Sequence, residues 1–168
     1  MNYNKNKLEE YFYVSGTNII LSNIKEESQK IIFLKPDCSV TSLFFSISST
    51  NERLIIVGEK TKTHDPHSIP SEKNFPRVEI INLDNKIIKE RRTLDHSFYT
   101  NNISSYILDA IIPNNSDLCY SLVKSCAPNV LETKLFVWEY IPLSLKTIFN
   151  YEGHIEAIVP DPKNGSKL

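Results

Sequence analysis

The chain has few of the residues on which phosphate loops, disulfide frameworks and membrane spans depend. Its 168 residues include only four glycines, none in a GxGxxG or GxxxxGK arrangement, so a nucleotide-phosphate loop is not expected. The three cysteines (Cys38, Cys119 and Cys126) form no CxxC pair, which indicates reduced thiols. No apolar run approaches the ~20 residues of a membrane span, and the first ten residues are too polar for a signal sequence. We therefore expect a cytoplasmic protein without a membrane partner.

Signatures of nucleic-acid binding and of catalysis are equally scarce. The formal net charge is −1, and the one short basic cluster, Lys86–Arg92, alternates with apolar residues as the solvated face of a strand does. Binding to a phosphate backbone needs a basic excess or stripe, so no nucleic-acid partner is expected. No Gly-x-Ser-x-Gly elbow is present, and no cysteine has a recognisable catalytic neighbourhood. The sequence predicts no enzymatic activity and no cofactor.

A recurrence is the most informative pattern that the chain does contain. Ile47–Lys60 (ISSTNERLIIVGEK) and Ile111–Lys124 (IIPNNSDLCYSLVK) lie 64 residues apart. Each begins with apolar residues, continues with a polar turn and ends with a second β-rich run. Val78–Leu83 and Leu135–Tyr140 form a second pair of similar segments at a similar interval. Repeated supersecondary units are typical of repeat architectures, which usually bind partners along a surface.

Strand-like runs fill most of the remaining sequence. Short runs rich in Ile, Val, Phe, Tyr and Thr alternate with turn-forming residues, and helical periodicity is hard to find. We expect residues 1–10 to be a flexible lead-in and residues 11–168 to hold the strands of an all-β fold. The expected strands are Tyr11–Val14, Asn18–Ile24, Gln29–Leu34, Thr41–Ser48, Arg53–Glu59, Arg77–Leu83, Ile87–Leu94, Ser105–Ile112, Leu118–Lys124, Lys134–Ile141, Lys146–Tyr151 and Glu156–Val159.

These strands group into units. Tyr11–Leu34 makes a half unit, Thr41–Leu94 and Ser105–Tyr151 make two four-stranded units, and Glu156 opens another. Four antiparallel strands, the last leading into the next unit, build a propeller blade, so we expect a partial β-propeller of about two and a half to three four-stranded antiparallel blades. A ring needs at least four blades, and bare sheet edges invite aggregation. We therefore interpret the chain as part of a longer protein, or as one that completes its sheets with a partner chain.

The second four-stranded unit resembles the WD-repeat pattern. Trp138-Glu139 stands at the end of its third strand, where WD-repeat proteins carry Trp-Asp. Gly153-His154 stands where the following repeat would open with Gly-His, and the resemblance implies that His154 is a structural histidine in a hydrogen-bond network. The third-strand position of the first unit reads Asn82-Leu83-Asp84, and Gly-His is missing before the first two units. The signature is therefore degenerate outside the second unit.

The order of elements resembles more narrowly the N-terminal propellers of cilia- and flagella-associated WD-repeat proteins. This resemblance spans residues 11–159 and includes the opening strand pair Tyr13–Leu21, the return strand Gln29–Leu34 and a Leu-x-Val-Trp strand that ends at Trp138. It implies a non-catalytic protein-interaction scaffold, a structural or tethering component of the ciliary or flagellar axoneme. Its partners would be axonemal or cytoskeletal proteins.

Two long connections are the candidate contact surfaces. Thr61–Pro76 has three prolines and no periodicity, and Ser125–Thr133 occupies the corresponding place in the second unit. Loops of this length between strands are usually functional or disordered, and their matching positions suggest that both emerge on one face. We take as candidate partner contacts three residues of the first loop: His64, His67 and Phe75.

Two other classes of protein stay open. A small stand-alone β-domain could bind a ligand or a metal through the 61–76 loop, with His64, Asp65 and His67 as metal ligands. Structural zinc sites need four ligands in tight pairs, and no second pair has the right spacing, so we expect no metal. The other class is a small β-sandwich binding module. The sequence does not identify the partner, the face that binds it or the total number of blades.

Aromatic residues supply the expected core. Phe136, Trp138 and Tyr140 alternate along one strand and so share one face. We interpret them as residues that pack between blades, and the alternative is an exposed anchor for a partner. Four further aromatic residues are core candidates by the same argument: Phe44, Phe45, Tyr106 and Tyr120.

Overall fold

A computed structural model describes residues 10–34, 38–62, 74–84, 87–100, 105–125, 132–153 and 155–159. These residues form an all-β fold of eleven strands and one short 3-10 helix: β1 (Glu10–Ser15), β2 (Asn18–Asn23), β3 (Ser28–Leu34), β4 (Cys38–Ile47), β5 (Arg53–Lys62), β6 (Asn74–Asp84), β7 (Ile87–Asp95), η1 (Ser97–Tyr99), β8 (Ser105–Ile111), β9 (Leu118–Ser125), β10 (Glu132–Tyr140) and β11 (Leu143–Glu152). Eleven of the twelve expected strands are confirmed. The prediction of a strand at Glu156–Val159 is wrong, because that segment has no regular structure.

The strands form three antiparallel sheets in which chain neighbours pair. Sheet 1 contains β1, β2 and β3, sheet 2 contains β4 to β7, and sheet 3 contains β8 to β11. The two expected four-stranded units are therefore confirmed, and the expected half unit, Tyr11–Leu34, forms a three-stranded sheet. A two-sheet sandwich is excluded, because the described residues already form three sheets.

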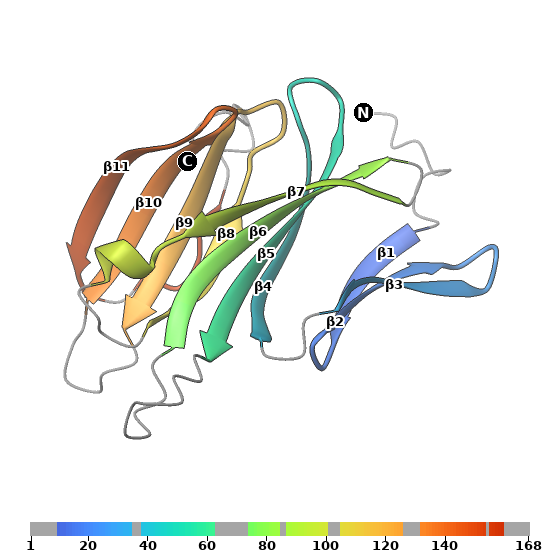
Figure 1. The fold of residues 1–168 in the computed structure, drawn as a ribbon, viewed down its shortest axis with the longest axis horizontal. Helices are drawn as coiled ribbons and strands as arrows, with labels where there is room; N and C mark the ends of the chain where they lie inside the picture. Colours follow the sequence, from blue (N-terminus) through green and yellow to red (C-terminus); the bar gives the residue numbers. More distant parts are fainter. Residues whose placement is uncertain are drawn as a thin grey trace.

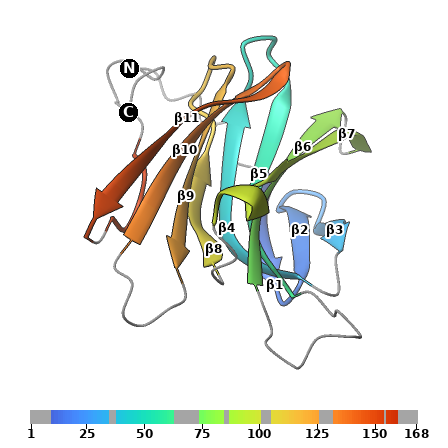
Figure 2. The same cartoon turned by 60° about the vertical axis from the view of Figure 1, so that its left-hand side comes forward.

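The sheets follow one another in chain order, with sheet 2 between the other two (Figure 1). Strand side chains alternate between the two faces of a sheet, and sheet 2 buries apolar side chains on both faces. Leu54 and Ile56 pack towards sheet 3, and Ile55 and Val57 pack towards sheet 1. The first strand of sheet 3 lies across sheet 2: β8 contacts β4, β5 and β6, and Figure 2 shows β8 beside β4.

The recurrent polar turns join neighbouring sheets. The turns after β4 and β8 each contain an asparagine in the left-handed region, Asn51 with φ 62° and Asn115 with φ 60°. Asparagine adopts this conformation more readily than most residues, which explains the polar turn in both copies of the repeat. The Asn115 amide donates to the Ile47 carbonyl at 2.9 Å, and the Asn114 Oδ1 accepts from the Ile47 amide at 3.1 Å. The two copies of the repeat are therefore hydrogen-bonded to each other at their turns.

The two candidate loops are shorter than predicted. β5 continues to Lys62 and β6 begins at Asn74, because these strand ends pair with each other across the expected loop. Phe75 is consequently a half-buried residue of β6 opposite Thr61, which corrects its placement in a loop. His64 and His67 lie outside the described residues. The second connection is likewise shortened, since β9 reaches Ser125 and β10 begins at Glu132.

Gly58 of β5 marks a close approach of sheets 2 and 3. A Cβ atom at this position would lie 2.6 Å from the Cγ2 atom of Ile107 on β8 and against the Ser42 hydroxyl. Ile107 is fully buried, so it cannot move aside without disturbing the core. We expect Gly58→Val to lower the free energy of unfolding by ~1–3 kcal/mol, measured by urea denaturation. The exposed Ser39→Val on β4 is the control, and equal stability of the two variants would contradict the close approach.

Candidate functional site

His96 is a buried polar side chain at the boundary between sheets 2 and 3. It directly follows β7 and precedes η1, so it lies where the chain leaves sheet 2 for sheet 3. Its side chain is fully buried. Its backbone amide donates to the Pro76 carbonyl of β6 at 3.2 Å, which fixes the start of this crossing to sheet 2.

The His96 ring makes hydrogen bonds to both sheets. Its Nε2 lies 2.7 Å from the Ser121 hydroxyl on β9 and 3.2 Å from the Trp138 indole nitrogen on β10. Its Nδ1 lies 3.0 Å from the Leu94 carbonyl on β7. A carbonyl only accepts and an indole N–H only donates, which assigns a neutral ring with its proton on Nδ1. Nε2 then accepts from the indole and from the serine hydroxyl.

Aromatic rings enclose this network. The His96 ring meets Phe136 edge-on at 4.8 Å between ring centres and Trp138 at 5.1 Å, and Tyr99 of η1 also packs edge-on against Phe136. Burial lowers the pKa of His96 to about 4, although the nearby Asp95 carboxylate acts in the opposite direction. The ring is therefore neutral at pH 7, in agreement with its hydrogen-bond partners.

The Ser121–His96 pair has the spacing of a nucleophile and its base, but the pair lacks access to solvent. Ser121 and His96 both have no exposed surface, and the Nε2 lone pair is shared with the indole N–H. Cys119, on the same strand, is also fully buried, and burial raises the pKa of its thiol well above the ordinary range. The geometry therefore joins β7 of sheet 2 to β9 and β10 of sheet 3, and it offers no path for a substrate.

The repeat-signature residues of the sequence analysis fall into three positions. Trp138 belongs to the His96 network and lies with Phe136 and Tyr140 in the core between sheets 2 and 3. Glu139 points to the opposite side of β10 and forms an ion pair with Lys146. Gly153, with φ 126°, follows β11, and its carbonyl accepts from the Thr133 hydroxyl at 3.3 Å. His154 lies outside the described residues.

Sequence reasoning overlooked His96, although a signal was present. His96 stands just ahead of the second four-stranded unit, where the WD-repeat pattern has Gly-His, but aspartate and not glycine precedes it. Trp138 follows 42 residues later in the same unit. Looking for histidine alone at that position, with tryptophan on the third strand, would have identified the pair.

Sheet 2 has aliphatic side chains at the positions that correspond to the polar network of sheet 3. β6 has a bulge before Leu83 and β10 has a bulge before Trp138, so Leu83 and Trp138 occupy equivalent positions in their sheets. Two residues before them, Ile81 pairs with Ile55 in sheet 2, and Phe136 pairs with Ser121 in sheet 3. Ile55 and Leu83 pack against sheet 1 in a wholly apolar cluster. Apolar contact therefore joins sheets 1 and 2, whereas sheets 2 and 3 also share a hydrogen-bonded histidine.

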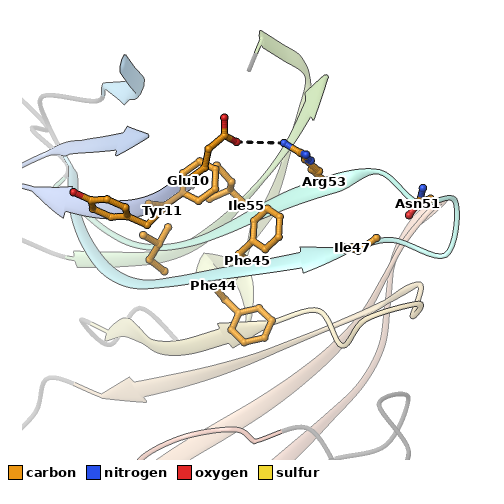
Figure 3. Close-up of a pocket in the computed structure, with 10 residues that line it drawn as sticks. Glu10, Tyr11, Phe44, Phe45, Ile47, Asn51, Arg53 and Ile55 are labelled. Carbon is orange, nitrogen blue, oxygen red and sulfur yellow. Dashed lines mark hydrogen bonds and ion pairs between the residues drawn. The ribbon is translucent and has the colours of Figure 1, made fainter. Parts of the chain in front are cut away.

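A second feature is a cavity of about 590 Å³ between β1, β4 and β5, which we name the β1–β4 groove (Figure 3). Phe12 of β1 and Phe45 of β4 stack in it at 5.6 Å. Glu10 and Arg53 form an ion pair at 3.4 Å on its rim. Phe45 is 44% exposed, so its prediction as a core residue is wrong, because only Phe12 of β1 stacks on it and no other described strand covers it. The other core candidates, Phe44, Tyr106 and Tyr120, are half-buried or buried.

The part of the chain that the structure describes holds no group of three or more His, Cys, Asp and Glu side chains placed to bind a metal ion. The proposed ligands His64, Asp65 and His67 lie outside it. Within the same described residues, no helix has the length and apolar character to cross a membrane.

Comparison with known proteins gives a similarity at the level of the fold. No family model and no curated protein matches the sequence. Among solved structures, the chain is similar to the crystal structure of dipeptidyl peptidase 4 from Porphyromonas gingivalis, with a TM-score of 0.50 and 11% sequence identity. The similarity covers 82% of this chain and 23% of that chain. At this identity it concerns the fold alone, which is all-β and compatible with a propeller-like arrangement of sheets.

Proposed function

We propose that the three sheets are blades of a WD-repeat-like β-propeller that acts as a non-catalytic protein-interaction scaffold. The observation that carries the proposal is the hydrogen-bonded histidine, serine and tryptophan at the boundary of sheets 2 and 3. His96 has the structural role that the WD-repeat resemblance assigned to a histidine, and His154, to which the resemblance assigned it, lies outside the described residues. Four-stranded meanders in chain order are the matching feature of a propeller blade.

The packing of the sheets supports a scaffold role. Buried cores on both faces of sheet 2 hold neighbouring sheets in one arrangement, so the strand ends from which the connections leave have fixed positions. The β5–β6 and β9–β10 connections leave from equivalent strand ends of sheets 2 and 3. They are the proposed partner-binding loops. As the cellular location we propose the ciliary or flagellar axoneme, which rests on the sequence resemblance.

The test uses the tagged chain in a ciliated cell. We expect the protein to remain with axonemes after detergent extraction. A variant with residues 63–73 replaced by Asn-Gly should lose this association while its melting temperature stays unchanged, because Lys62 and Asn74 are already paired and suit a tight turn. The control is Lys86→Gly, which gives the Asn85-Lys86 connection after β6 the same Asn-Gly sequence. Uniform cytosolic staining of the unaltered chain would contradict the axonemal proposal.

A further inference from the structure

Sheet 1 has one strand fewer than its neighbours. Sheets 2 and 3 each begin with a strand, β4 and β8, that pairs with the next strand in sequence, and β8 also lies across β4, β5 and β6 of the preceding sheet. β3 leads into β4 as β7 leads into β8, so β1 corresponds to the second strand of a four-stranded sheet. The corresponding first strand is not among the described residues of sheet 1.

The β1–β4 groove lies where that strand would stand. It is lined by the edge strand β1 and by β4, as a strand beside β1 and against the next sheet requires. Phe12 and Phe45 provide an apolar floor, and Figure 3 shows Phe45 on the side of β4 that faces Glu10 and Arg53. An exposed apolar groove beside a strand edge suits an extended segment that adds to the sheet.

Residues 155–159 follow sheet 3 as β4 follows sheet 1 and β8 follows sheet 2, and they belong to none of the three described sheets. Ile158 packs against the buried cluster formed by Ile111 of β8, Tyr120 of β9 and Val137 of β10. Its amide donates to the Asp109 carboxylate of β8 at 3.0 Å. The segment thus lies against a cluster that the first three strands of sheet 3 supply, and β8 contacts the first three strands of sheet 2. Val159 is 72% exposed, and the segment pairs with no described strand.

The two incomplete parts lie on opposite sides of one molecule. Sheet 2 separates sheet 1 from sheet 3 (Figure 1), so residues 155–159 on sheet 3 are far from β1 of the same chain. A second copy can bring them together. We propose that residues 155–159 of one copy dock beside β1 of another as the fourth strand of its sheet 1, and that two copies do so reciprocally.

Sheets 1 and 3 carry large exposed apolar side chains on the faces that point away from sheet 2, as this contact requires. Phe12 packs inward, so its neighbour Tyr11 faces outward on sheet 1, and Ile31 does the same beside the buried Ile32. On sheet 3, Phe149 and Tyr151 of β11 are exposed. Large exposed apolar side chains on two opposite faces mark interaction surfaces, and a contact between different faces is head-to-tail. In the proposed dimer, each outer face of sheet 1 covers the partner's sheet 3.

The test measures the mass of the full chain by light scattering during size-exclusion chromatography. We expect twice the mass of one chain at high concentration. Val159→Asp damages only the donated strand, and Phe45→Ser damages only the groove. Each substitution should raise the dissociation constant about tenfold or more, because each removes apolar contact at the docking site. Phe98→Ser is the control, since Phe98 is 86% exposed on η1 and lies outside both surfaces.

Mixing the two variants separates this arrangement from other dimers. A pair made of one Phe45→Ser chain and one Val159→Asp chain retains one intact strand and one intact groove that meet each other. Because Phe45 and Val159 meet at one docking contact, substituting both there should cost less than the sum of the two separate losses. The free energy of association of the mixture should therefore be more favourable than the mean of the two variants measured alone. The mass of one chain at the highest soluble concentration, or a mixture no tighter than that mean, overturns the proposal.

Discussion

Replacing His96 by alanine is expected to lower the free energy of unfolding by ~3–5 kcal/mol, the largest effect of any single substitution considered. The change removes a fully buried ring and leaves a cavity between two aromatic side chains. It also leaves the Trp138 N–H and the Ser121 hydroxyl buried without their shared acceptor. Because domains are stable by only ~5–15 kcal/mol, a loss of this size should be evident in urea denaturation.

Two further variants separate the hydrogen bonds from the packing. Trp138→Phe keeps an aromatic ring but removes the donor, so we expect a loss of ~1–3 kcal/mol from the unpaired Nε2 and the smaller ring. The double variant His96→Ala with Trp138→Phe should lose less than the sum of the two single losses, by ~0.5–3 kcal/mol, because the partners interact directly. Phe98→Ala, on the exposed 3-10 helix next to His96, should change stability by less than ~0.5 kcal/mol. Strict additivity of the His96 and Trp138 substitutions would contradict their hydrogen bond.

Acid is expected to destabilise the protein through His96. Burial lowers the pKa of this residue from 6.5 to about 4, so the unfolded chain binds a proton at a pH where the folded chain does not. The contribution of the neutral ring is fully present above pH 6.5 and is lost as the pH falls towards 4. A difference of this size corresponds to ~3 kcal/mol over that interval, at 1.36 kcal/mol for each pKa unit.

The control for this pH dependence is His96→Gln. Glutamine offers both a donor and an acceptor but does not titrate in this range. Carboxylates such as Glu52, whose pKa is lowered mainly by its hydrogen bond from Lys89, also lose stabilising contacts in acid and do so equally in both proteins. The difference in stability between the original protein and His96→Gln should therefore shrink from pH 7 to pH 4. Parallel pH curves for the two proteins would contradict a buried neutral histidine.

The sheets could be predicted from the sequence because their signals are local. Short runs rich in apolar and β-branched residues define strands such as β5 and β9. The polar turns with Asn51 and Asn115 define the hairpins that join β4 to β5 and β8 to β9. Pairing of chain neighbours then fixes the meander. The 64-residue recurrence adds the grouping into units, because a repeated pattern marks repeated hairpins.

Features that depend on how sheets stack could not be predicted in this way. The His96 network joins residues 25 and 42 positions apart, and it forms only when the end of β7 reaches β9 and β10. Nothing in the local pattern distinguishes His96 from an exposed turn residue. The exposure of Phe45 has the same origin, because its burial depends on whether sheet 1 has a strand beside β1.

The error at Glu156–Val159 has a simple physical reason. The segment has the composition of a strand, but a strand is defined by hydrogen bonds to a neighbour. Residues 155–159 lie against sheet 3 through Ile158 and Asp109, without a partner strand in the described part of the chain. Local propensity indicated the segment correctly, and the pairing that would complete it was not available from the sequence.

The most direct test of the account is the NMR signal of the indole N–H, which is unambiguous because Trp138 is the one tryptophan in the chain. The account predicts a single indole signal that exchanges slowly with D₂O, shows coupling across the hydrogen bond to an imidazole nitrogen, and loses that coupling in His96→Gln. An indole proton that exchanges as fast as in an unfolded chain and is unchanged by His96→Gln would contradict the histidine bridge between sheets 2 and 3.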